Sequence, residues 1–193
     1  MKLTIINYGA GNVFSVSSAF QRLGIEPNLS NDLIEIRSSD LVVFPGVGHA
    51  EMAMSQIKKS GLDALIPDLK QPVLGICLGM QLMCESTEEG NVKGLNIFEN
   101  VRVKLFDDEL KVPHMGWNEI EETKGILNGL IDPVYFIHSY FAPINEYTIA
   151  ETNYPTAFSA AMQKDNFIGC QFHPEKSGEV GEEILKRFLS LKK

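Results

Sequence analysis

The sequence predicts an α/β protein with a mostly parallel central sheet, flanked by helices and extended by mixed or antiparallel strands. In the first half of the chain, short β-rich runs alternate with amphipathic segments, which is typical of a parallel sheet covered by helices. From about residue 101, strand-like runs are separated only by turns, which favours antiparallel or mixed pairing. Because 193 residues suit one domain, we expect residues 1–193 to form a single unit.

The first half should supply four strands and the helices that connect them. The runs that predict strands are Leu3–Ile6, Glu26–Leu29, Leu41–Phe44 and Val73–Ile76. A helix is expected after the first run, where four apolar residues recur at helical spacing, namely Val13, Val16, Phe20 and Leu23. A second helix is expected over Ala50–Ser60, before the last of these strands.

The second half should complete the sheet and close with a helix. Its strand-like runs are Val101–Leu105, Tyr135–His138, Tyr147–Glu151, Phe158–Gln163 and Ile168–Phe172. The terminal segment, Glu182–Leu191, is predicted to be an amphipathic helix. The apolar residues that share one face of this helix are Ile184, Leu185, Phe188 and Leu189.

The composition excludes several classes of function. The formal net charge of -8 opposes binding to nucleic acid or anionic lipid, both of which select basic surfaces. The longest apolar stretches reach only eight residues, too few to cross a bilayer, and the N-terminus lacks the apolar length of a secretory signal. Small molecules or another protein are therefore the expected partners.

The cysteines and histidines bear on metal binding and on the cellular compartment. Cys77, Cys84 and Cys170 form an odd set without C-x-x-C spacing, which argues against a disulfide framework or zinc site and fits a reducing compartment. The four histidines are widely spread, so a metal site has little support. We expect a cytoplasmic protein with no metal or cofactor.

The strongest chemical signal is Gly75-Ile76-Cys77-Leu78-Gly79, which ends a buried strand and leads into a helix predicted over Met80–Ser86. The G-x-C-x-G pattern resembles a nucleophile elbow, where glycines permit a tight turn that holds the nucleophile at the carboxyl edge of the sheet. The helix N-terminus should stabilise a thiolate on Cys77. The alternative is an inert buried cysteine, as expected for Cys84 on the same helical face.

A proton-transfer partner for Cys77 is available in Gln171-Phe172-His173-Pro174-Glu175, at the end of a predicted strand. Pro174 favours an extended conformation at His173, so that side chains 173 and 175 can project to the same side. Glu175 would then accept a hydrogen bond from the imidazole and fix its tautomer. The alternative is a turn with a solvated histidine and glutamate.

Acyl transfer through a thioester also requires hydrogen-bond donors for the oxyanion. In an elbow, one donor is the N–H after the nucleophile, here that of Leu78, and a second comes from a glycine-rich loop after a neighbouring strand. Pro45-Gly46-Val47-Gly48, directly after the strand predicted over Leu41–Phe44, fits that loop. The alternative is a plain Pro-Gly turn.

Other conspicuous residues are interpreted as structural. Gly9-Ala10-Gly11-Asn12 follows the first strand but lacks the third glycine of a dinucleotide-binding motif, because residue 14 is Phe. His49 and His114 are expected at the surface or in turns. Trp117 is expected to be a core aromatic.

Together, these motifs resemble the class I glutamine amidotransferases. The segments that carry the resemblance are Gly75–Gln81, Pro45–Gly48 and Gln171–Ser177. A narrower resemblance to the glutaminase subunits of imidazole glycerol phosphate synthases rests on Tyr8–Asn12, Val112–Asn118 and Phe136–Tyr140. The resemblance covers nearly the whole chain in order and implies the α/β fold of that family.

The resemblance implies a Cys-His-Glu triad in which Cys77 attacks the side-chain amide of glutamine, His173 acts as general base and acid, and Glu175 orients His173. It implies oxyanion N–H donors at Val47 and Leu78. Residues implied to hold glutamine are Gly48, Gln81, Glu89, Ser139 and Tyr140, with Glu89 facing the α-amino group. Residues implied to face the synthase partner are Asn12, Trp117, Tyr135 and Lys176.

The ammonia should be consumed on another chain, because one glutaminase domain leaves no length for a second active site. The resemblance implies a (β/α)8 cyclase subunit that forms a heterodimer with this chain in histidine synthesis. Departures from the usual pattern leave a sugar-amidating synthase of surface-glycan synthesis as an alternative partner; they are Asn7, His49-Ala50, Gly94–Phe98 and Tyr154-Pro155. Two other classes stay open, a cysteine peptidase and a catalytically silent binding module.

Overall fold

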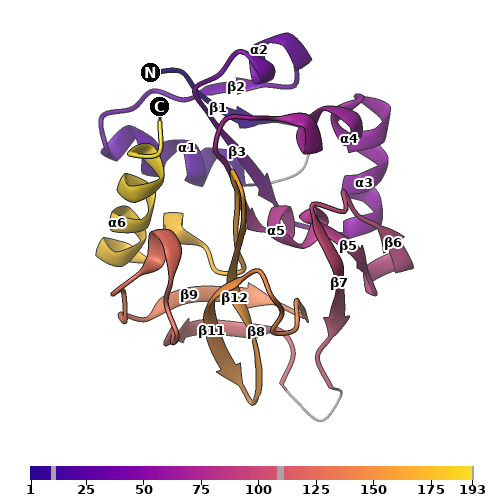
Figure 1. Cartoon of the computed structure of the whole chain (residues 1–193), viewed down its shortest axis with the longest axis vertical. Helices are drawn as coiled ribbons and strands as arrows, with labels where there is room; N and C mark the ends of the chain where they lie inside the picture. The colour runs from indigo at the N-terminus through magenta and orange to yellow at the C-terminus, as the bar shows by residue number, and fades with distance from the viewer. Residues whose placement is uncertain (10–11, 108–110, 193) are drawn as a thin grey trace.

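A seven-stranded sheet forms the centre of the molecule in the computed structural model, which describes residues 1–9, 12–107 and 111–192. The strand order is β11-β12-β13-β4-β3-β1-β2. These strands are β1 (Leu3–Ile6), β2 (Asn28–Ser30), β3 (Leu41–Gly46), β4 (Val73–Cys77), β11 (Thr148–Tyr154), β12 (Thr156–Lys164) and β13 (Phe167–Cys170). Figure 1 shows the sheet passing through the middle of the molecule with helices on both sides.

The pairing of the strands confirms the predicted fold class. β2, β1, β3, β4 and β13 are parallel neighbours, and β12 and β11 extend them in antiparallel fashion. The second strand lies at Asn28–Ser30 rather than at the predicted Glu26–Leu29. Pro27 explains the difference, because proline has no N–H to donate to a neighbouring strand.

The helices cover the two faces of the sheet. α1 (Val13–Arg22) and α6 (Gly178–Leu189) lie on one side in Figure 1, whereas α3 (Ala50–Lys59), α4 (Leu62–Leu65) and α5 (Leu78–Met83) lie on the other. In β3, Leu41 and Val43 join the apolar core that contains Phe20 and Phe188, while Val42 and Phe44 join the opposite core. Because this strand is buried on both faces, its sequence is continuously apolar.

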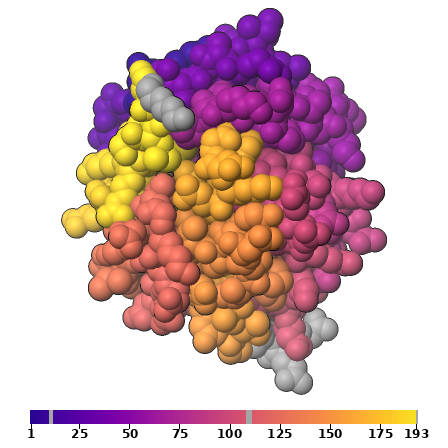
Figure 2. Space-filling view, viewed as in Figure 1, coloured from indigo at the N-terminus to yellow at the C-terminus, as the bar shows by residue number. Residues whose placement is uncertain are grey.

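The C-terminal helix is attached to a segment from the middle of the chain. Nη1 of Arg187 donates to the carbonyl oxygens of Ile126 and Asn128, at 3.0 and 2.9 Å. In Figure 2, α6 in yellow lies beside the salmon-coloured segment that contains the 3-10 helix η3 (Gly125–Leu127). The terminal helix predicted over Glu182–Leu191 is confirmed, although it spans Gly178–Leu189.

Two smaller sheets and several short elements complete the structure. One sheet pairs β8 (His114–Asn118) with β9 (Val134–His138), and the other contains β10 (Tyr140–Phe141), β7 (Phe98–Leu105), β5 (Cys84–Thr87) and β6 (Val92–Lys93). The short helices are α2 (Leu33–Arg37) and the 3-10 turns η1 (Ile66–Asp68), η2 (Glu89–Asn91) and η4 (Pro174–Lys176). Of these strands, only β7 and β9 are predicted from the sequence.

The helix predicted over Met80–Ser86 is wrong at its C-terminal end, because α5 stops at Met83 and Cys84 begins β5. Cys84 pairs with Phe98 of β7, and its carbonyl oxygen accepts from the N–H of Asn96 at 3.1 Å. Strand pairing therefore overrides the local helical spacing. Cys84 is still a buried thiol, as expected, and burial raises its pKa.

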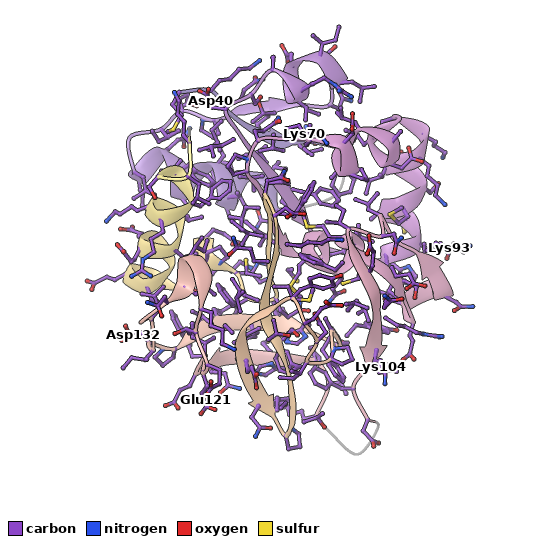
Figure 3. The ribbon with its side chains drawn as sticks, viewed as in Figure 1. Asp40, Lys70, Lys93, Lys104, Glu121 and Asp132 are labelled. Carbon is purple, nitrogen blue, oxygen red and sulfur yellow. The ribbon has the colours of Figure 1, made fainter. Side chains whose placement is uncertain are left out.

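Most charged side chains of the described residues lie at the outside of the molecule. Figure 3 shows Lys93, Lys104 and Glu121 projecting from its periphery. Within the described part of the chain, no helix combines the length and apolar character needed to cross a membrane.

Candidate active site

Cys77 lies at the carboxyl end of β4, where the strand turns directly into α5. Its φ of 53° and ψ of -110° are unusual for a residue other than glycine, and such strained backbone is concentrated at functional sites. A Cβ on Gly79 would collide with the carbonyl oxygen of Phe44 in β3, so this glycine allows α5 to pack closely against the sheet. The arrangement has the strand–turn–helix form expected of a nucleophile elbow.

His173 follows β13, the strand next to β4, and two contacts fix its backbone. Its N–H donates to the carbonyl oxygen of Tyr135 at 2.8 Å, and the hydroxyl of Ser177 donates to its carbonyl oxygen at 2.7 Å. Nδ1 of His173 lies 2.7 Å from Oε1 of Glu175, and both side chains are almost completely buried. Side chains 173 and 175 therefore project to the same side.

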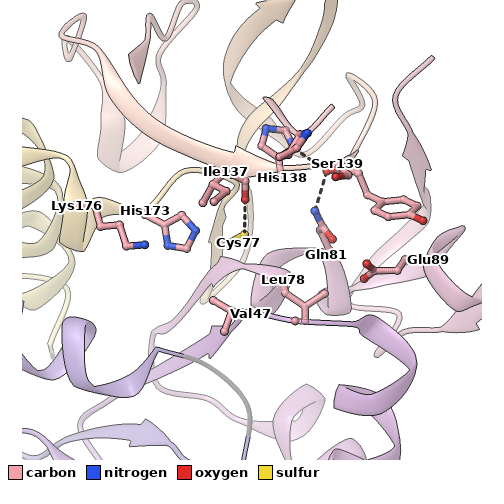
Figure 4. Close-up of a pocket in the computed structure, with 13 residues that line it drawn as sticks. Val47, Cys77, Leu78, Gln81, Glu89, Ile137, His138, Ser139, His173 and Lys176 are labelled. Carbon is pink, nitrogen blue, oxygen red and sulfur yellow. Dashed lines mark hydrogen bonds between the residues drawn. The ribbon is translucent and has the colours of Figure 1, made fainter. Parts of the chain in front are cut away.

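The other ring nitrogen of His173, Nε2, has no hydrogen-bond partner among the described residues. The ring points toward Cys77 in Figure 4. Burial alone would lower the pKa of His173, but its interactions with the Cys77 sulfur and the Glu175 carboxylate outweigh burial and raise this pKa to about 9. An imidazolium held between a carboxylate and a sulfur favours the thiolate, which is the nucleophilic form of cysteine.

A cavity of about 310 Å³ opens beside Cys77 (Figure 4). The candidate residues that line it are Val47, Gly48, Cys77, Leu78, Gln81, Glu89, Ser139, Tyr140, His173 and Lys176. Glu175 is not part of this lining and reaches the site through its contact with Nδ1 of His173. The cavity lies at the carboxyl ends of β3, β4 and β13, the edge where ligands bind in parallel α/β sheets, and its volume suits a small molecule.

Glu89 and His173 lie at opposite ends of this cavity in Figure 4. Oε2 of Glu89 accepts from the N–H of Ala50, the first residue of α3, at 2.8 Å. The positive end of the helix dipole stabilises the carboxylate there. The cavity therefore has a thiol and an imidazole at one end and an anionic group at the other, where a cationic group of a ligand can bind.

The loop after β3 approaches the start of α5 closely. The strand register pairs Gly46 with Cys77, and a Cβ on Gly46 would lie 2.6 Å from the backbone nitrogen of Gly79. The hydroxyl of Tyr8 donates to the carbonyl oxygen of Pro45 at 2.9 Å and so holds the end of β3 from which this loop leaves. Val47 and Leu78 lie on the same side of Cys77 in Figure 4, and both line the cavity.

Three of the residues expected at a partner interface form a cluster at the surface, in which Trp117 and Lys176 are exposed and Tyr135 is half-buried. The rings of Trp117 and Tyr135 meet edge to face, 6.1 Å apart, and Nζ of Lys176 lies 5.9 Å from the centre of the Tyr135 ring. The expectation that Trp117 is a core aromatic is wrong, because it is 58% exposed. The pairing of β8 with β9 turns it outward. Asn12 is the N-cap of α1, a helix that contacts the 3-10 turn η4 in which Lys176 lies.

The surface or turn position expected for His114 is also wrong. His114 is only 4% exposed, and its ring stacks on those of Phe136 and Tyr154, at centroid distances of 4.8 and 4.0 Å. It faces inward in β8, where its Nδ1 lies 3.1 Å from Nε2 of His138. His49 is exposed at the N-cap of α3, as expected.

The hydrogen bonds around His114 and His138 assign both rings as neutral. The carbonyl oxygen of Tyr140 can only accept, so Nδ1 of His138 donates to it, at 2.8 Å. Nδ2 of Asn118 donates to the carbonyl oxygen of Asn153 at 3.1 Å, so the same amide nitrogen also donates to Nε2 of His114, at 3.3 Å. Nδ1 of His114 therefore carries the ring hydrogen and donates to Nε2 of His138. Burial lowers the pKa of His114 to about 4, and burial together with the neighbouring histidines lowers that of His138 to about 3.

These two histidines should make the protein less stable in acid. Their pKa values in the folded protein lie below the unfolded value of about 6.5, so their contribution to stability is complete above that pH and is lost as the pH falls toward 4 and 3. Each contributes a slope of up to about 1.4 kcal/mol per pH unit in that range. In urea unfolding at a series of pH values, His114→Gln should show a shallower acid-side loss than the wild type, and equal slopes would contradict the assignment.

Sequence reasoning missed several residues around the nucleophile. Nε2 of Gln171 lies 3.6 Å from the Cys77 sulfur, and the carbonyl oxygen of Ile137 lies 3.8 Å from it on another side. Pro113 and His138 also line the cavity. Gln171 had a detectable signal, because it is a polar residue at the end of an apolar strand, two positions before His173 and hence on the same side.

Among residues 1–9, 12–107 and 111–192, no group of three or more His, Cys, Asp or Glu side chains could hold a metal ion. A thiol paired with a buried His–Glu couple can attack a carbonyl carbon and form a thioester.

Comparison with known proteins identifies relatives along almost the whole chain. The family profile described as glutamine amidotransferase class-I matches residues 4–191. Proteins named imidazole glycerol phosphate synthase subunit HisH are similar at full length. That of Bacteroides fragilis is 53% identical, covering 99% of this chain and 100% of the relative. That of Haemophilus influenzae is 45% identical, covering 98% and 97%.

Solved structures support the fold. A crystal structure described as glutamine amidotransferase superposes with a TM-score of 0.79 at 14% identity, covering 100% of this chain and 99% of that one. The structure of PurLQS from Thermotoga maritima superposes with a TM-score of 0.72 at 17% identity, with the same coverage. At these identities, the likeness shows a shared fold.

Proposed function

Because the chain belongs to the class I glutamine amidotransferase family, we propose that it is the glutaminase subunit of imidazole glycerol phosphate synthase in histidine biosynthesis. The observation that carries this proposal is the cavity in which Cys77 meets the buried His173–Glu175 pair, in a chain 53% identical to a full-length relative of that name. The proposed reaction is hydrolysis of glutamine to glutamate and ammonia.

In the proposed first step, the Cys77 thiolate attacks the side-chain amide carbon of glutamine. His173, protonated and oriented by Glu175 at 2.7 Å, gives its proton to the departing ammonia and leaves a glutamyl thioester. His173 then removes a proton from water, which attacks the thioester. Glutamate is released, and the Cys77 thiolate is left beside the protonated His173, as at the start. The N–H groups of Val47 and Leu78 stabilise the oxyanion formed in both steps.

The cavity supports a defined orientation for glutamine. With the amide carbon at Cys77, the α-amino group reaches toward Glu89, whose carboxylate is held at the N-terminus of α3. Gly48, Gln81, Ser139 and Tyr140 line the space between these ends and complete the proposed substrate site. Residues 1–193 would act as one glutaminase domain.

The ammonia is proposed to pass to a (β/α)8 cyclase subunit bound as a heterodimer. The surface cluster of Trp117, Tyr135 and Lys176 supports an interface on this side, since Lys176 belongs both to the cluster and to the cavity lining. Asn12 is proposed to join that interface. A cytoplasmic location fits a chemistry that needs a free thiol, and Cys77, Cys84 and Cys170 are all unpaired.

Glutamate release should be slow in the isolated chain and rise about 10²- to 10³-fold when the cyclase and its nucleotide ligand bind. This factor is expected if binding completes one oxyanion donor, such as the N–H of Val47. Coupled glutamate assays with and without the cyclase measure the ratio. Equal turnover in both would contradict partner control.

The same assay separates the remaining alternatives. A sugar-amidating synthase in place of the cyclase should give no stimulation. Peptide substrates should not be cleaved, in contrast to what a cysteine peptidase would do. A silent binding module would release no glutamate with either partner.

A further inference from the structure

Gln171 is a buried polar side chain beside the nucleophile with no role in the proposed reaction. It is 0% exposed. It follows β13, whose last residue, Cys170, pairs with Ile76, so the register places Gln171 beside Cys77. Its Nε2 lies 3.6 Å from the Cys77 sulfur, an ordinary distance for an N–H donor to an atom as large as sulfur.

A chain of hydrogen bonds determines which end of the Gln171 amide faces the sulfur. The carbonyl oxygen of Tyr140 can only accept, so the group of Gln81 that lies 2.8 Å from it must be the donor Nε2. The same nitrogen lies 2.9 Å from Gln171, which must present its acceptor Oε1 there. The carbonyl oxygen of Tyr140 therefore orients Gln81, and Gln81 in turn directs the NH₂ group of Gln171 at Cys77.

We propose that Gln171 is a positioning residue for the nucleophile, whose N–H orients the Cys77 sulfur and favours its thiolate form. This inference rests on the proposed glutaminase function. An N–H donor stabilises the anionic state of its acceptor. The sulfur also contacts a backbone group, the carbonyl oxygen of Ile137 at 3.8 Å, which can only accept and so favours the protonated thiol.

Few other described groups that titrate act on this sulfur. Three groups interact with it electrostatically, namely Tyr8, which follows β1, Cys170 of β13, and His173. Burial raises the pKa values of Tyr8 and Cys170, so both stay neutral where enzymes are normally assayed. The groups that favour a thiolate on this sulfur are thus the imidazolium of His173, which is a cation, and the amide of Gln171, which is a neutral hydrogen-bond donor.

The experiment measures the rate at which iodoacetamide alkylates Cys77 across a pH series, in the chain bound to its synthase, with the modified peptide identified by mass spectrometry. Gln171→Met removes the amide and should raise the midpoint of the profile by about one pH unit. Below the midpoint, this shift corresponds to about tenfold less thiolate and about tenfold slower alkylation. Gln171→Glu replaces the donor with a carboxylate of the same shape and should raise it further. Both should lower kcat with little change in KM.

Gln71→Met is the matched control, since it removes an amide that donates to the carbonyl oxygen of Ile36 at 2.9 Å, near the opposite end of β4. It should leave the alkylation profile unchanged. An unchanged midpoint in whichever Gln171 variant folds, judged by its unfolding transition, would overturn the inference. Alkylation needs no glutamine, so an unchanged midpoint bears on the role of Gln171 alone. The proposed function would be refuted by a different result, namely that the wild-type complex releases no glutamate.

Discussion

Cys77→Ala is expected to lower partner-stimulated glutamate release by about 10⁴-fold or more, because no other group in the cavity can form the thioester. Alanine removes the sulfur but keeps the Cβ at the strained position where β4 turns into α5. The measurement is glutamate release at saturating glutamine in the complex with the cyclase.

Two controls show that the chemistry, and not the assembly, is lost in Cys77→Ala. The variant complex should still make product from added ammonium salt, because the cyclase active site is intact. Cys84→Ala, which removes a buried thiol in β5, should keep glutaminase activity near that of the wild type. Full activity in Cys77→Ala would refute both the nucleophile and the mechanism.

Glu175→Gln should lower glutaminase activity by about 10²- to 10⁴-fold. An amide can still accept from Nδ1 of His173, so the geometry at 2.7 Å is retained, but the negative charge that stabilises the imidazolium is lost. Since Glu175 helps to raise the pKa of His173, this pKa should also fall, and kcat would drop while KM changes little. Steady-state kinetics of the complex measure both constants.

A charge-matched control for Glu175→Gln is Glu179→Gln, an exposed position in the first turn of α6. It removes the same charge from the surface without touching His173. If the two variants lost activity to the same small extent, Glu175 would have no role in orienting the imidazole.

The sequence was sufficient to predict the parallel sheet and its antiparallel extension. Runs such as Leu41–Phe44 and Val73–Ile76 are apolar at every position and sit between helical patterns, which is the pattern of strands buried on both faces. The site could be located for the same reason. Cys77 and His173 each follow such a strand, and adjacent parallel strands bring their carboxyl ends to one edge.

What the sequence could not show depends on contacts between distant segments. The inward position of His114 and the outward position of Trp117 are set by the pairing of β8 with β9, across the intervening chain. Cys84 lies in a strand because β7 is available to pair with it. Local spacing carries no information about either partner.

The role inferred for Gln171 has the same origin. The motif that contains His173 is visible in the sequence, but the donor end of the Gln171 amide is selected by Gln81 and the carbonyl oxygen of Tyr140, both far away along the chain. Only the folded arrangement assigns that hydrogen bond to the Cys77 sulfur.

Labelling with a glutamine analogue that carries an electrophilic carbon in place of the amide carbon tests the central claim most directly. In the complex with the cyclase, the account predicts one adduct per chain, on Cys77, with parallel loss of glutaminase activity and protection by glutamine. Complete inactivation with Cys77 unmodified, or labelling that glutamine does not slow, would contradict it.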